Sequence, residues 1–142
     1  MAISILPIRR NLKFNLNPAK ALTWHRDGLN VSQFMNTMSL FFPVGERFFI
    51  DSVRNYRDQI TDPELKKAVT AFIGQEAMHS LEHIAMNQHV RDQGMPVEEM
   101  ERDLKVILDV ARKLPKRHQL AITCALEHIT AMMADMLLER DD

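Results

Sequence analysis

Apolar residues recur at helical spacing over four long stretches of this chain, and no stretch has the pattern of a strand. The spacing predicts four helices, at about 31–58, 61–93, 97–114 and 117–139. Three of these exceed twenty residues, which suits a bundle. We therefore expect an all-α helical bundle. Because the preceding residues lack a clear period, we predict one domain, 1–142, with an extended arm at 1–30 and the bundle at 31–142.

Local signals place the ends of these helices. Asn30 or Ser32 is the expected N-cap of the first helix, because a short polar side chain there accepts a hydrogen bond from the first turn. Asp62 followed by Pro63 is a strong start for the second helix. Gly94 is a typical residue at which a helix stops.

The apolar stripes predict which faces are buried. The first helix has its stripe at Phe34, Met38, Phe42, Phe49 and Val53, and the third at Met100, Leu104, Ile107, Leu108 and Ala111. Pro43 interrupts the first stripe and predicts a kink, since proline removes a backbone donor and crowds the preceding turn. Trp24 is the residue that we expect to anchor the arm to the bundle.

Composition narrows the class of protein. The chain has 142 residues, of which 46% are apolar, so it is long and apolar enough for a folded core. A formal net charge of −1 without a basic cluster argues against a nucleic-acid partner. Cys124 is the only cysteine, which excludes an intrachain disulfide and favours a reducing compartment. We find no signal peptide and no run near the roughly 20 apolar residues of a membrane span. We expect a cytoplasmic protein without a membrane partner.

Three acidic residues lie on the apolar stripes of three long helices: Glu46, Glu76 and Glu127. A carboxylate on a buried face costs several kcal/mol unless it is paired, protonated or bound to metal. His79 follows Glu76 by three residues and shares its helix face. Together they resemble part of the ferritin-like di-metal template, in which two helices each give a Glu and two others each give Glu-x-x-His. Oxygen-rich ligation with an imidazole suits iron or manganese.

A second metal template begins within the same helix. His79, Glu82 and His83 match the H-x-x-E-H pattern, in which two histidines bind zinc and the glutamate is the general base. Glu127 is a candidate third ligand. This template leaves Glu46 and Glu76 unexplained on their stripes.

Neither template excludes an ordinary structural role. Glu76, His79 and His83 could form a solvated helix face with pairs three and four residues apart. Glu46, taken alone, could pair with a neighbouring arginine.

Three motifs in order resemble a bacterial family labelled predicted metal-dependent hydrolases. They are SLFFPVGERFF at 39–49, FIGQEAMHSLEH at 72–83 and LEHITA at 126–131. The resemblance covers the chain from about Trp24 onward. It implies a ferritin-like fold and metal-ligand roles for Glu46, Glu76, His79 and Glu127, with His83 also in the pattern. It further implies a later helix with a second Glu-x-x-His, so we expect this chain to be an amino-terminal part whose last liganding helix is missing.

These observations together give an expected function. We expect a metal-dependent enzyme with two iron ions that oxidises a small organic substrate with O₂; manganese and zinc are alternative metals. The first alternative function is hydrolysis by a metal-activated water, with Glu82 as the catalytic base. The second is a non-catalytic helical fragment with an incomplete metal site. An apolar groove left by the missing helix would favour a homodimer.

Overall fold

The computed structural model describes residues 6–139, and all its regular elements are helical. Four long helices and two short 3₁₀ helices follow one another along the chain. They are η1 (Pro18–Lys20), α1 (Leu29–Arg54), η2 (Arg57–Gln59), α2 (Pro63–Asp92), α3 (Val97–Ala111) and α4 (Lys116–Leu138). The predicted all-α helical bundle is therefore confirmed.

Two of the predicted helix ends are correct and one N-cap is wrong. The Asp62 carboxylate accepts a hydrogen bond from the Leu65 backbone N–H at 2.8 Å and caps α2. Gly94 follows α2 with φ of 92°, a conformation that favours glycine. The N-cap of α1 is Gly28, with φ of 95°, and not Asn30 or Ser32.

Ser32 has a different role from the predicted cap. Its hydroxyl donates to the Gly28 carbonyl at 3.0 Å and accepts from the His25 backbone N–H at 2.9 Å. Helix α1 continues without interruption through Pro43 and ends at Arg54, earlier than predicted. The residues after it form η2 instead of a further helical turn. Local hydrogen bonding thus shifts the ends of α1 but not its existence.

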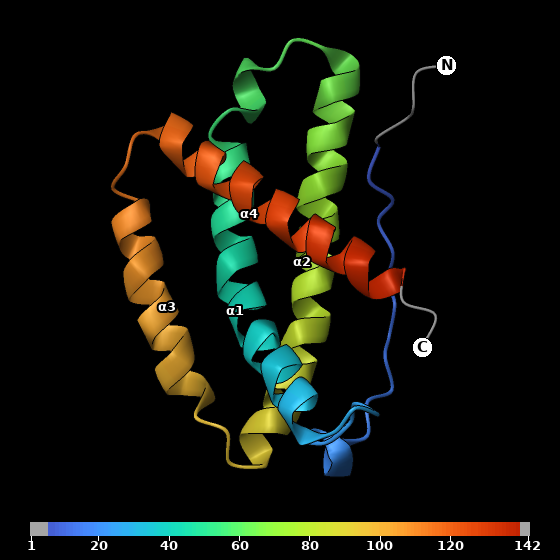
Figure 1. Ribbon diagram of the computed structural model, residues 1–142. Helices are drawn as coiled ribbons and strands as arrows, with labels where there is room; N and C mark the ends of the chain where they lie inside the picture. Colours follow the sequence, from blue (N-terminus) through green and yellow to red (C-terminus); the bar gives the residue numbers. More distant parts are fainter. Residues whose placement is uncertain (1–5, 140–142) are drawn as a thin grey trace.

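Helices α1 and α2 lie side by side and form the centre of the fold (Figure 1). Helix α3 packs on α1, and α4 runs obliquely across α1 (Figure 1). A buried hydrogen bond between the hydroxyls of Ser52 and Thr123, at 2.7 Å, fixes the early part of α4 on α1. Glu127 lies one helical turn after Thr123, so this contact also directs Glu127 toward α1.

The apolar core is small and lies among α1, the first half of α2, α3 and the start of α4. Phe48, Phe49 and Leu108 are buried together, with Phe72, Leu104 and Ile122 packed around them. Two predicted stripe residues are not part of it: Phe34 is 58% exposed and Ile107 is 65% exposed. Much of the buried surface of α1 is polar instead, at Ser32, Asn36, Ser39, Glu46 and Ser52. Of these, Ser39 and Glu46 contact polar side chains of α2. Because buried polar groups are costly without partners, this pair indicates a functional site between α1 and α2.

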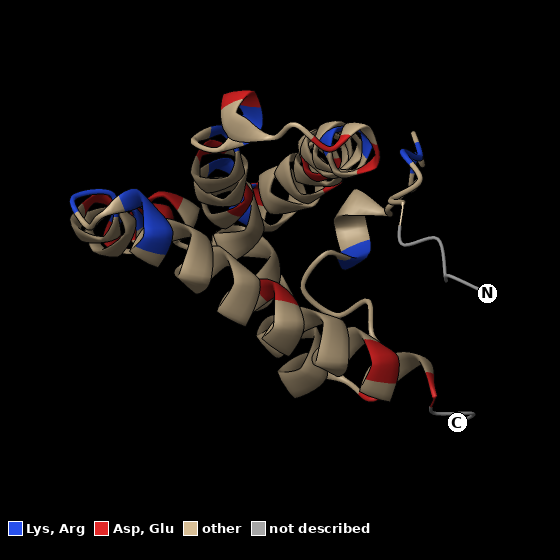
Figure 2. Cartoon of the chain, turned by 90° about the horizontal axis from the view of Figure 1, so that it is seen from above, with Lys and Arg blue, Asp and Glu red and all other residues tan. Residues whose placement is uncertain are grey.

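Helix α4 presents an apolar surface to solvent. Its exposed residues include Ile129, Met132, Met136 and Leu138. Figure 2 shows that most of this helix carries neither acidic nor basic side chains. Contrary to the expectation from sequence, α4 is long and apolar enough to cross a membrane, judged by length and composition only, and 6% of its apolar window is buried. The mean hydropathy of this window tolerates the few charged residues within it, Glu127 among them, and one such helix is a weak indication of membrane insertion.

Hydrogen bonds hold the arm to the bundle at Trp24, at Pro18 in η1 and at Phe14. The Trp24 indole N–H donates to the Asn36 side-chain oxygen at 3.0 Å, as the predicted anchor requires. Gln93 at the end of α2 donates to the Pro18 carbonyl. Farther toward the amino terminus, the Phe14 backbone N–H donates to the Glu82 carboxylate at 3.2 Å. The arm therefore passes along the face of α2 that carries the candidate site residues.

Candidate metal centre

Glu46 is the buried carboxylate at the middle of α1, with only 1% of its surface exposed. One oxygen, Oε2, accepts a hydrogen bond from the Ser80 hydroxyl on α2. The other, Oε1, lies 2.7 Å from His79 Nδ1. That contact is close but not aligned as a hydrogen bond, and Oε1 has no hydrogen-bond partner among residues 6–139. A buried carboxylate oxygen in this state is costly unless a cation satisfies it.

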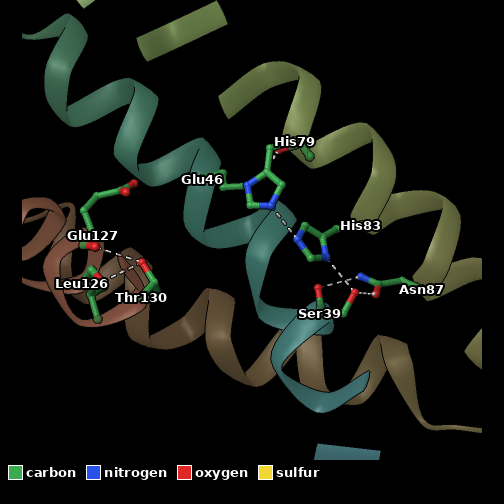
Figure 3. Close-up of polar contacts among 9 residues, drawn as sticks. Ser39, Glu46, His79, His83, Asn87, Leu126, Glu127 and Thr130 are labelled. Atoms are coloured by element: carbon green, nitrogen blue, oxygen red, sulfur yellow. Dashed lines mark hydrogen bonds and ion pairs between the residues drawn. The ribbon is translucent and has the colours of Figure 1, made fainter. Parts of the chain in front are cut away.

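The hydrogen-bond network determines which nitrogen of His83 carries a proton. The Ser39 hydroxyl donates its single proton to Asn87 Oδ1 at 2.7 Å, so it accepts from His83 Nδ1 at 2.8 Å (Figure 3). The proton of neutral His83 is therefore on Nδ1, and Nε2 keeps its lone pair. Phe42 stacks on the His83 ring with centroids 4.4 Å apart. Burial, and then the nearby charge of His79, lowers the pKa of His83 to about 4.

His79 connects the buried carboxylate with His83. Its Nε2 lies 3.0 Å from His83 Nε2. Since His83 Nε2 is an acceptor, the His79 Nε2 of a neutral ring donates to it, which leaves a lone pair on His79 Nδ1 facing Glu46 Oε1. His79 Nδ1 and Glu46 Oε1 are then two acceptor atoms 2.7 Å apart, and a cation between them, either a proton or a metal ion, is required to offset their repulsion. The Glu46 carboxylate at Nδ1 accordingly raises the pKa of His79, against the effect of burial.

Two further glutamates add negative charge to this site. Glu76, one turn before His79 on α2, is 5% exposed. Burial, and then the charges of Glu127 and Glu46, raises the pKa of Glu76 to about 7. Burial also raises the pKa of Glu127, with a further contribution from Glu46. Figure 3 shows the Glu127 carboxylate extending from α4 toward α1. Three carboxylates from three helices therefore influence one another around His79.

Comparison with known families identifies the class of protein. A sequence model of the family described as predicted metal-dependent hydrolase matches residues 8–142, nearly the whole chain. The chain belongs to this family. No curated protein matches it. No solved structure matches it either.

A member of a metal-dependent family should have residues that fit a divalent cation, and the site meets this test. Ligand atoms of Glu46, His79 and His83 all lie within 4.8 Å of one another. The donors are carboxylate and imidazole, which suit iron, manganese or zinc. The unsatisfied Oε1 of Glu46 is the specific observation that a bound cation would explain. The family and the cluster together support a divalent metal.

The two metal templates correspond to two tautomers of His79. If its proton is on Nε2, the lone pair on Nδ1 and Glu46 Oε1 point to a shared cation, as in the Glu-x-x-His template. If its proton is on Nδ1, Glu46 orients the ring and the Nε2 atoms of His79 and His83 face a cation, as in H-x-x-E-H.

The predicted residues Glu46, His79 and His83 come together in the structure. Glu76 and Glu127 are their electrostatic neighbours, and their roles as ligands stay predictions. Glu82, the predicted catalytic base, borders the same cavity as the two histidines and accepts a hydrogen bond from the arm. Its role in catalysis likewise stays a prediction.

Sequence reasoning missed the residues that hold the site in place. Ser39, Ser80 and Asn87 each contact a candidate ligand or its support. Ser39 lies seven residues before Glu46, and Asn87 four after His83, so each shares a helix face with a candidate ligand. That spacing was the signal available in the sequence. It becomes informative only once α1 and α2 are known to pack together.

Proposed function

We propose that this protein is a di-iron enzyme of ferritin-like type that oxidises a small organic substrate with O₂. Glu46, Glu76, His79 and Glu127 would hold the metal ions. The observation that carries the proposal is the buried Glu46 Oε1, which has no hydrogen-bond partner in the described part of the chain. Two further carboxylates with raised pKa, Glu76 and Glu127, interact electrostatically with Glu46. Such an excess of desolvated negative charge is costly without cations and suits a pair of divalent ions.

The chain's own residues have distinct tasks in this proposal. Ser80 orients Glu46 through a hydrogen bond to Oε2, which directs Oε1 toward His79. His83, held by Ser39, accepts the Nε2 proton of His79 and so keeps the Nδ1 lone pair available. Phe42 packs against both imidazoles, stacked on His83 and tilted against His79. Bound iron would supply the capacity to react with O₂.

The test of this proposal is oxygen uptake. Metal-free protein is loaded anaerobically with Fe(II) and then mixed with O₂, and consumption is followed with an oxygen electrode. We expect uptake proportional to protein-bound iron and its loss in Glu46→Gln, which keeps the side-chain shape but removes the charge. Glu101→Gln on α3, a helix with none of the site residues, is the matched control. Iron binding without O₂ uptake above that of free iron would contradict the proposal.

Metal-assisted hydrolysis is the second candidate function. Two observations favour it: the 3.0 Å approach of His79 Nε2 to His83 Nε2, and the position of Glu82 beside the same cavity. The family description points the same way. In this arrangement a bound zinc ion would activate water, and Glu82 would accept its proton. Hydrolysis of a p-nitrophenyl ester by the zinc-loaded protein, lost in Glu82→Gln, would favour this candidate over the first.

A further inference from the structure

A cavity of about 400 Å³ lies directly beside the two histidines. Its walls come from the arm, α1, α2 and α4, and His79, Glu82 and His83 border it on the α2 side. The other walls are mainly apolar and include Phe14, Trp24, Met38, Phe42, Met86 and Met133. A volume of this size is typical of sites for small molecules. If each non-hydrogen atom of a ligand occupies about 30 Å³, the volume of a water molecule in the liquid, the cavity holds roughly a dozen such atoms.

Away from His79, Glu82 and His83, the polar side chains in these walls have little capacity left for a ligand. Asn36 accepts from the Trp24 indole at 3.0 Å and donates to the Ala21 carbonyl at 2.9 Å. The Ser39 hydroxyl is engaged by His83 and Asn87. Because these hydrogen bonds stay within the protein, the walls away from the histidines act as an apolar surface. A charged group placed there would lose its hydration without compensation.

The arm separates this cavity from a second cleft with different chemistry. That cleft also touches His79 and Glu82, but its lining includes the charged side chain of Arg10. The hydrogen bond from the Phe14 backbone N–H to Glu82 lies where the two meet, since both residues border both spaces. Of these two spaces, both formed by residues 6–139, the cavity among α1, α2 and α4 reaches both histidines and the cleft reaches His79 alone, so the cavity is the better candidate for a substrate.

We propose that this cavity binds an uncharged, mainly apolar alkyl or aromatic substrate of roughly a dozen non-hydrogen atoms, with its reactive end against His79 and His83. That the ligand is a substrate rests on the proposed function; that the cavity binds it does not. The methionines support the assignment, because their flexible side chains adapt to apolar ligands of varied shape.

Trp24 gives a direct readout, since it is the only tryptophan in the chain and lines the cavity. The experiment titrates metal-free protein with 1-decanol and separately with decanoate, and follows the emission wavelength of Trp24. Decanol should shift the emission to shorter wavelength with saturation, because it displaces water around an indole that is 46% exposed. Decanoate, with the same chain and a charged end, should bind at least ten times more weakly.

A matched pair of variants tests the location. Ala134 borders the cavity, whereas Ala125 lies on the same helix outside it, and both are exposed enough to accept a larger side chain. Ala134→Phe should weaken decanol binding at least tenfold, and Ala125→Phe should leave it unchanged. Equal binding of decanoate and decanol, absence of any saturable shift, or equal effects of the two variants would overturn the proposal. Conversion of a dimer to a monomer by Ala134→Phe, with no decanol binding to wild type, would assign the surface to a second copy instead.

Metal content and oxygen uptake, measured without decanol, separate this proposal from the proposed function. Decanol binding without iron binding would support the cavity as an apolar ligand site and contradict the di-iron enzyme. Iron-dependent oxygen uptake without decanol binding would support the di-iron enzyme and contradict the cavity as an apolar ligand site.

Discussion

Replacement of Glu76 by glutamine should stabilise the metal-free protein at alkaline pH. Burial and two neighbouring carboxylates raise the pKa of Glu76 from 4.5 to about 7. The folded protein therefore binds a proton at Glu76 more tightly than the unfolded protein does. The corresponding stabilisation is present below about pH 4.5 and is lost as the pH rises through 7. A shift of this size corresponds to about 3 kcal/mol, which partial hydration and relaxation should reduce to about 1–2 kcal/mol.

The assay is urea unfolding of wild type and Glu76→Gln without metal, at pH 4.5 and pH 8. At pH 8 we expect the variant to be about 1–2 kcal/mol more stable, and at pH 4.5 the two proteins should be nearly equal. Glu101→Gln should change stability by the same small amount at both pH values. The comparison within one pH cancels the opposing contribution of His83, whose lowered pKa makes the folded state more stable as pH rises from about 4 to 6.5.

Metal should reverse the order of the two proteins. A ligand present at a hundred times its Kd stabilises a fold by about 2.7 kcal/mol. If Glu76 is a ligand, Fe(II) should stabilise wild type by about this amount and Glu76→Gln by much less. A variant that is less stable than wild type at pH 8 without metal would refute the electrostatic reasoning. Equal stabilisation of both by Fe(II) would remove Glu76 from the metal site.

Three other outcomes follow from the same site. His79→Ala should abolish metal retention and His83→Ala should reduce it only in part, as measured by elemental analysis; equal losses would favour the H-x-x-E-H arrangement. Ser39→Ala, which releases the Nδ1 of His83, should weaken Fe(II) binding less than tenfold in a fluorescence competition assay, whereas a loss of about 10–100-fold would mean that His83 is itself a ligand. The exposed face of α4 should drive self-association, so light scattering at micromolar concentration should show a dimer that Met136→Lys weakens, and a monomer of 16.5 kDa would contradict this.

The helices could be predicted from sequence because their signals are local. Apolar spacing, the Asp62 cap and the Gly94 stop depend on residues a few positions apart. The N-cap of α1 could not be predicted in this way, because Asn30 and Ser32 have better capping side chains than Gly28. In the structure Gly28 is the N-cap, and the Ser32 hydroxyl donates to its carbonyl. Local signals thus give the existence of an element more reliably than its first residue.

The buried faces were harder to predict than the helices. The apolar stripe of α1 led to Phe34, which is exposed, whereas Ser39 and Ser52 on the same helix are buried. Periodicity reports which residues share a face, but the packing of α2 and α4 decides which face is covered. Glu46 was identified because a carboxylate on an apolar stripe is costly. Its partner Ser80 was not, since the contact joins residues 34 positions apart.

The most direct test of the account is the metal content of the purified chain after anaerobic loading with Fe(II) and removal of free ions. The account predicts about two iron ions per chain, or per dimer if a second copy completes the site, and their loss in His79→Ala. One zinc retained in preference to iron would contradict the di-iron centre and favour the hydrolase. Absence of any bound metal would contradict the central claim that the unsatisfied oxygen of Glu46 and the facing nitrogen of His79 form a metal site.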